Sequence, residues 1–172
     1  DLPVPFVGVV THAVEAAVNV TKNNKIGVIG TAATINSGAH KNYIEQLLPT
    51  AKVFANNCNL FVPMVEEGLV DENDPVVFET ASRYLAPIKA QGIDTLILGC
   101  THYPVLSKVI QKIMGNGVTL INMGEATADY VVKCLDQNNL RNDTNRIGNQ
   151  IFFVSDKAES FKRQAEILLG DT

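Results

Sequence analysis

The chain has 172 residues, 46% of them apolar and 19% charged, with a formal net charge of −4. This composition can build the core of one domain or a little more. Its lysines and arginines are scattered, so no basic stripe is available to neutralise a phosphate backbone, and we expect no nucleic-acid partner. The longest apolar runs are the size of single strands, well short of the roughly 20 residues that span a bilayer, and we expect no membrane span.

The chain contains three cysteines, Cys58, Cys100 and Cys134. Their odd number and the lack of C-x-x-C spacing argue against a disulfide framework and against a structural zinc site. Such a set fits a reducing cytoplasm. The sequence opens on Asp-Leu-Pro, without an initiator methionine or a secretory signal, and we expect it to be a fragment whose beginning is missing.

Short β-branched runs alternate along the chain with longer amphipathic stretches. The predicted strands are residues 6–10, 26–29, 53–55, 95–98, 118–121 and 151–154. The predicted helices are residues 12–20, 37–48, 76–91, 105–114, 126–135 and 158–169. The polar segment 138–150 is predicted to be a loop. This alternation predicts an α/β fold with a mostly parallel sheet flanked by helices.

The segment TLILGCTHYP places Cys100, Thr101 and His102 in the turn between a buried strand and the helix begun by Pro104. A thiol just before a helix N-terminus is favoured as thiolate, because it meets the positive end of the helix dipole and unpaired N–H groups. His102 is placed to assist proton transfer, and the Thr101 hydroxyl suits a substrate carboxylate. The alternative is a buried structural cysteine, with Thr101 as a helix cap and His102 packed in the wall.

Two further segments suggest parts of the same site. GVIGTAAT ends a strand at Gly30 and places Thr31 and Thr34 one helical turn apart, so both hydroxyls can face one anion. A capping threonine is the alternative explanation. The segment LFVPMVEEG carries two adjacent glutamates near its end. If one of these carboxylates reached His102, it would fix the tautomer of the imidazole ring. The alternative is a helix end with solvated charges.

At these segments the sequence resembles the glutamate racemases, which interconvert L- and D-glutamate without pyridoxal phosphate and supply D-glutamate for bacterial cell-wall peptidoglycan. The matching stretches appear in family order over most of residues 5–130, and LGCTHYP is the most specific part. They are IGVIGTAATINSGAH, LFVPMVEEG, DTLILGCTHYPVL and VTLINMGEAT. The resemblance implies a cytoplasmic isomerase that acts on glutamate with no cofactor and no metal, as a homodimer when full length.

The resemblance also implies two α/β domains that hold glutamate between them, each supplying one cysteine on opposite faces of the α-carbon. Inverting a carbon centre in this way needs a base on one face and an acid on the other. Catalytic roles fall to Cys100, His102 and Glu66, and substrate contacts to Thr101, His102, Thr31 and Thr34. Residues 19–124 would form the complete second domain, while 1–18 and 125–172 would be remnants of a first domain whose N-terminal part is absent.

The family's first cysteine lies in a Cys-Asn-Thr motif that these residues do not contain, and Cys58 and Cys134 stand in other contexts. We therefore expect this chain alone to be inactive. Two alternatives remain open. One is an aspartate racemase or a related amino-acid racemase or decarboxylase, and the other is a non-catalytic interaction fragment.

Overall fold

The computed structural model describes residues 6–142, 151–155, 159, 161–162 and 165–166. Contacts between residues divide the chain into two compact units, Asp1–Cys134 and Leu135–Thr172. The first unit contains the sheet and all the candidate site residues. Among the residues described, no helix combines the length and apolar character that a bilayer crossing requires.

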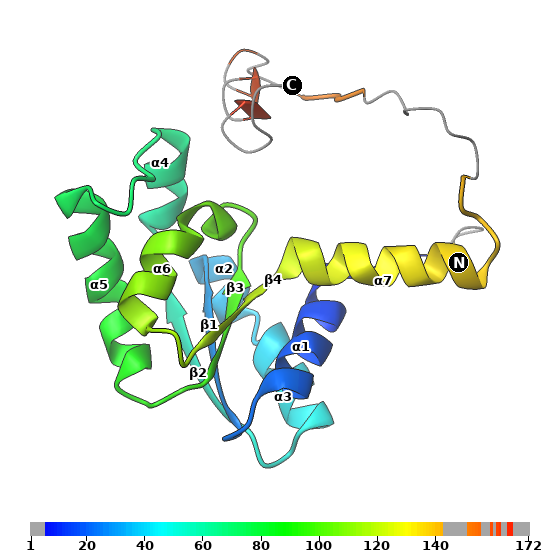
Figure 1. Ribbon diagram of the computed structural model, residues 1–172, viewed down its shortest axis with the longest axis horizontal. Helices are drawn as coiled ribbons and strands as arrows, with labels where there is room; N and C mark the ends of the chain where they lie inside the picture. The colour runs from blue at the N-terminus through cyan, green and yellow to red at the C-terminus, as the bar shows by residue number, and fades with distance from the viewer. Residues whose placement is uncertain (1–5, 143–150, 156–158, 160, 163–164, 167–172) are drawn as a thin grey trace. The chain divides into compact units, whose positions relative to one another are not determined.

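The first unit is built on a sheet of four parallel strands in the order β2-β1-β3-β4. The strands are β1 (Lys25–Gly30), β2 (Lys52–Asn57), β3 (Thr95–Gly99) and β4 (Thr119–Asn122). Parallel neighbours need a crossover connection, and helices provide it here (Figure 1). All five residues of β3 are buried, as expected for a central strand covered on both faces. The predicted α/β fold is confirmed.

The helices are α1 (Val9–Val20), α2 (Ala32–Asn36), α3 (Ala39–Leu47), α4 (Phe61–Glu66), α5 (Pro75–Lys89), the 3₁₀ helix η1 (Tyr103–Leu106), α6 (Ser107–Met114) and α7 (Met123–Gln137). Helices α1 and α3 lie on one side of the sheet, and α5 and α6 lie on the other (Figure 1). Two apolar clusters result. Ile26, Val28 and Ile97 pack toward α1 and α3, whereas Leu96 and Leu98 pack toward α5 and α6.

Helix α5 has a well-defined start. The Asp74 carboxylate accepts hydrogen bonds from the amides of Val76 (2.7 Å) and Val77 (3.4 Å), and Pro75 occupies the first helical turn. An aspartate cap followed by proline fixes the beginning of a helix, because the cap satisfies otherwise unpaired N–H groups and proline has none to satisfy. Val77 and Leu85 then anchor the helix in the core.

Asp94 stabilises the amino-terminal edge of the sheet. Its carboxylate accepts hydrogen bonds from the Thr21 hydroxyl and from the amides of Lys22 and Asn23, each at 2.7 Å, and from the Thr95 hydroxyl at 2.9 Å. Burial alone would raise the pKa of this carboxyl, but the hydrogen bonds outweigh it and hold the pKa below its ordinary value. The turn after α1 is thereby tied to the start of β3.

Two strand predictions are wrong. Residues 6–8 are not in a strand, and α1 begins at Val9 with Gly8 as its N-cap. Residues 151–154 are also not in a strand, and their side chains are exposed, Phe153 at 91%. An apolar run of this length does not distinguish a strand from a helix start, and a strand needs a partner to pair with. The short helices α2 and α4 lie outside the predicted helix ranges, although a capping threonine at Thr31 and a helix end at the carboxylates of LFVPMVEEG were among the alternatives.

In the second unit, the described residues 159, 161–162 and 165–166 are helical, in agreement with the predicted helix 158–169. The other residues of that helix, and 143–150 of the predicted loop, lie outside the described residues. Arg141 donates a hydrogen bond to Asp136 at 3.0 Å, and the rings of Phe152 and Phe161 lie 5.9 Å apart.

Candidate active site

The candidate site lies at the carboxyl edge of the sheet, where β1 and β3 end side by side. Gly30 and Gly99 are register partners, so Thr31 and Cys100 follow them at neighbouring positions. Gly30 is also paired with Asn57, the last residue of β2. Ligands of open parallel sheets bind beyond this edge, because the loops there are positioned by rigid strands.

The two glycines allow an unusually close approach of the backbone at this edge. A Cβ on Gly99 would lie 2.7 Å from the carbonyl oxygen of Ile29, and one on Gly30 would lie 3.0 Å from Cγ2 of Thr34. The Gly99 position therefore excludes any side chain unless the strands move. The same geometry brings the Thr34 methyl group to 3.6 Å from that Gly99 position, so the segment after β1 packs directly over the end of β3.

Cys100, His102 and Glu66 form a row at this edge. The Cys100 sulfur lies 3.9 Å from Nδ1 of His102, and Nε2 of the same ring lies 3.5 Å from Oε1 of Glu66. The side chains of His102 and Glu66 are 26% and 43% exposed, and Cys100 is half-buried. Glu66 is the last residue of α4, a helix 36 positions earlier in the chain, so the fold brings together residues that are distant in sequence.

The row has a simple chemical consequence. A carboxylate next to Nε2 favours the tautomer with its proton on that nitrogen, and Nδ1 is then an acceptor. The acceptor faces the Cys100 sulfur and also the Thr101 hydroxyl, which lies at 3.4 Å. The imidazole can therefore receive the thiol proton while Glu66 stabilises the imidazolium that forms.

Thr31 and Thr34 are close to each other and to the end of β3. Thr31 caps α2 by accepting a hydrogen bond from the Thr34 amide at 3.3 Å, and the two hydroxyl oxygens lie 3.1 Å apart. The capping role considered from the sequence is therefore present. Both side chains remain partly exposed, as is required if they are also to contact a ligand.

The sequence did not identify Tyr103 as a support for this edge. Tyr103 follows His102 directly, is fully buried, and donates its hydroxyl to the carbonyl of Cys58 at 2.9 Å. Burial raises the pKa of the Tyr103 phenol, and it raises the pKa of the Cys58 thiol to about 12. The raised pKa disfavours the Cys58 thiolate, and the Cys58 backbone carbonyl holds the turn that carries Cys100. The sequence feature that could have identified Tyr103 is a tyrosine within an apolar motif, since the hydroxyl of a buried tyrosine needs a hydrogen-bond partner.

His40 is a second residue that sequence reasoning missed. It lies buried on α3, 3.4 Å from the Met123 sulfur through Nε2, and no hydrogen-bond partner is found for its Nδ1 among the described residues. Burial lowers the pKa of His40, which favours the neutral form of the ring. Its Cε1 lies 3.7 Å from the position that a Gly99 Cβ would take, so the ring packs behind the end of β3.

No group of three or more His, Cys, Asp or Glu side chains suited to a metal ion occurs in the part of the chain that the structure describes. An open cavity of about 690 Å³ lies elsewhere, along α5, and none of the predicted site residues lines it.

The four-stranded parallel sheet and its flanking helices define an α/β protein, and a thiol, a histidine and a carboxylate lie at the carboxyl edge of its sheet. The family profile described as Asp/Glu/Hydantoin racemase matches residues 1–131, and the chain belongs to this family.

Similar proteins agree with this assignment. The glutamate racemase of Persephonella marina is 44% identical over 167 residues, which are 97% of this chain and 61% of that protein. The glutamate racemase of Enterococcus faecalis is 47% identical over 135 residues, 78% of this chain and 49% of that protein. The chain thus spans about three fifths or less of these curated relatives.

Solved structures of glutamate racemases have the same fold. The RacE1 isoform from Bacillus anthracis superimposes with a TM-score of 0.91 at 36% identity, covering 99% of this chain and 63% of the other. The enzyme from Francisella tularensis, solved in complex with D-glutamate, gives a TM-score of 0.87 at 36% identity, covering 98% and 61%.

Proposed function

We propose that this chain carries one half of the proton-transfer and substrate-binding machinery of a glutamate racemase, an isomerase that needs neither pyridoxal phosphate nor a metal. The observation that carries the proposal is the row of Glu66, His102 and Cys100 at the sheet edge. The relatives support glutamate over aspartate, because those compared above are glutamate racemases and the Francisella tularensis enzyme binds D-glutamate.

In the proposed mechanism, the Cys100 thiolate removes the α-proton of one glutamate enantiomer, and the electron pair of the C–H bond passes to the α-carbon and its carboxylate. A second thiol on the opposite face, outside these residues, returns a proton and gives the other enantiomer. His102, supported by Glu66, holds the proton that Cys100 must lose to become a thiolate. Hydroxyls of Thr101, Thr31 and Thr34 bind the substrate and stabilise the developing charge.

The assignment of one thiol to each of two domains rests on the positions of the cysteines. We propose that residues 19–124 form the second of two racemase domains and that 1–18 together with 125–172 belong to the first, with α1 (Val9–Val20) crossing that boundary and packing on the sheet of the second. The present chain holds no Cys-Asn-Thr motif, and its buried Cys58 has the properties of a structural thiol. One thiol can exchange a proton on one face only, so inversion requires the other half. We propose that this polypeptide does not racemise glutamate by itself.

The wider setting is part of the same proposal. The product D-glutamate supplies peptidoglycan synthesis, and hence the cell wall and cell shape, in a bacterial cytoplasm. The full-length protein acts as a homodimer on a small-molecule substrate, with no nucleic-acid or membrane partner. Size-exclusion chromatography with light scattering checks the dimer, and a monomeric active enzyme would contradict it.

The decisive experiment follows the conversion of L-glutamate to D-glutamate by circular dichroism in the full-length enzyme. Cys100→Ser is expected to lower kcat by roughly 10²- to 10⁴-fold, because the proton-transfer base is lost. Cys134→Ser is the matched control and is expected to keep activity. Retained activity in the Cys100 variant would refute the assignment, and faster turnover of L-aspartate than of L-glutamate would move the enzyme to the alternative substrate. D-glutamate formed by the 172-residue chain alone would contradict the proposed division.

A further inference from the structure

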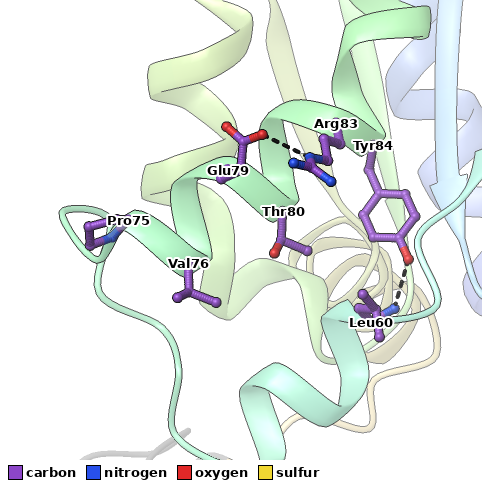
Figure 2. A pocket seen from close by; sticks show the side chains of 7 residues that line it. All are labelled: Leu60, Pro75, Val76, Glu79, Thr80, Arg83 and Tyr84. Carbon is purple, nitrogen blue, oxygen red and sulfur yellow. Dashed lines mark hydrogen bonds and ion pairs between the residues drawn. The ribbon is translucent and has the colours of Figure 1, made fainter.

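A second candidate site lies along α5, away from Cys100. The cavity of about 690 Å³ there is open to solvent and has the size of pockets that hold small molecules (Figure 2). Its apolar lining comes from Leu60, Pro75 and Val76, together with the ring of Tyr84. Leu60 and Val76 are 53% and 59% exposed, so the apolar wall is accessible to a ligand.

The polar lining of this α5 pocket defines the chemistry of its ligand. Arg83, Glu79 and Thr80 complete the wall. Arg83 donates from Nε to Oε1 of Glu79 at 2.8 Å (Figure 2), and no hydrogen bond of the described residues involves its terminal nitrogens. Those nitrogens form the flat fork that binds a carboxylate through two parallel hydrogen bonds. The side chains of Arg83 and Glu79 are 77% and 61% exposed and offset each other's charge, so a ligand carboxylate would share the guanidinium with Glu79. An apolar wall with the remaining nitrogens of that guanidinium beside it fits a small molecule that has an apolar body and one carboxylate.

The pocket is connected to the candidate active site by packed aromatic rings. The Leu60 amide donates to the Tyr84 hydroxyl at 3.3 Å, which ties the pocket wall to the residue before α4. Phe61 packs edge-on against Tyr84, with ring centroids 5.4 Å apart, and against Tyr103 at 5.2 Å. Tyr103 adjoins His102, and α4 ends at Glu66, so both ends of the His102–Glu66 pair rest on this row of rings.

We propose that the α5 pocket is a regulatory site for a small amphipathic carboxylate, which acts on the Cys100 turn through Tyr84, Phe61 and Tyr103. A ligand against Tyr84 and Leu60 restricts the start of α4, and the contacts of Phe61 with Tyr84 and Tyr103 carry that restriction towards the Cys100 turn. The regulatory meaning rests on the proposed racemase function, but binding and its effect on Cys100 do not.

Binding is tested on the 172-residue chain with phenylbutyrate as the probe, its uncharged amide as the matched ligand, and backbone amide NMR shifts as the readout. Phenylbutyrate is expected to bind in the millimolar range, as its size allows, with saturable shifts at Thr80 and Arg83. The amide is expected to bind about fivefold more weakly, and Arg83→Gln to remove that difference. Lys41→Gln, in the comparable Lys41–Glu45 pair on α3, is expected to leave it intact.

Coupling is tested through the rate at which iodoacetamide alkylates Cys100, measured by peptide mass spectrometry against Cys134 in the same molecules. Saturating phenylbutyrate is expected to change the ratio of the two rates by about fivefold in the unmodified chain and not in Arg83→Gln. Absence of saturable shifts, or equal affinity for the acid and its amide, would overturn the site. Binding with an unchanged ratio would overturn the regulatory role. Neither readout needs racemisation, so these failures are distinct from failure of the proposed enzyme activity.

Discussion

Replacing Gly99 by alanine is expected to destabilise the sheet at the very end that carries Cys100. The new Cβ would lie 2.7 Å from the carbonyl oxygen of Ile29, which is well inside van der Waals contact. Because that oxygen belongs to the neighbouring strand, no side-chain rotation relieves the clash, and β1 and β3 must separate locally. Overpacking of this kind costs about 1–3 kcal/mol in the free energy of unfolding, or roughly a five- to 150-fold change in the folding equilibrium.

Gly117→Ala is the matched control, because a Cβ at Gly117 meets nothing within 4 Å. It makes the same chemical change without a clash and is expected to shift stability by less than about 1 kcal/mol. The measurement is urea unfolding followed by far-ultraviolet circular dichroism, since the chain has no tryptophan. If Gly99→Ala and Gly117→Ala unfold at the same urea concentration, the close approach of β1 and β3 does not constrain this edge.

Three other predictions follow from buried or hydrogen-bonded groups. Tyr103→Phe removes the donor to the Cys58 carbonyl and is expected to cost about 1 kcal/mol in urea unfolding; no loss would mean that this bond does not hold the turn. The native chain treated with iodoacetamide near pH ~8 is expected to be labelled at Cys100 and not at the buried Cys58, whose pKa is about 12, until denaturant is added. The lowered pKa of Asp94 stabilises the fold above the unfolded-state value of about 4. The stability advantage over Asp94→Asn should therefore be full near pH ~7 and shrink as the pH falls through the lowered pKa, and an advantage independent of pH would contradict this.

Much of the fold could be predicted from local sequence. The central strand 95–98 is a run of buried β-branched and leucine residues that follows the polar Asp94, and the structure extends it by only one residue, to Gly99. The run at 6–10 has the same apolar character, yet Gly8 is the N-cap of α1 and Val9 begins that helix. What distinguishes the two is the presence of pairing strands on both sides of β3, and pairing is not encoded in either run by itself.

The candidate site could also be predicted only in part from local sequence. The three consecutive residues Cys100, Thr101 and His102 could be predicted to form one turn, because they lie between a strand and a proline. A carboxylate of LFVPMVEEG near His102 could only be considered as one of two alternatives, and the family resemblance, not the spacing, selected Glu66. The support from Tyr103, and the packing of His40 behind Gly99, depend on contacts between distant segments that no local pattern contains.

The partial exposure of the Glu66–His102 pair determines how strongly these residues interact. At a separation of 3.5 Å, the attraction between a carboxylate and an imidazolium depends chiefly on the surrounding dielectric, and it is about four times stronger at an effective value near 20 than in bulk water. Water reaches both side chains on the surface seen here, so the pair is screened. Anything that covers this edge of the sheet and displaces that water would strengthen the attraction between the two side chains. Hydration of this edge therefore sets how strongly Glu66 and His102 attract each other, and a bound ligand is one means of changing it.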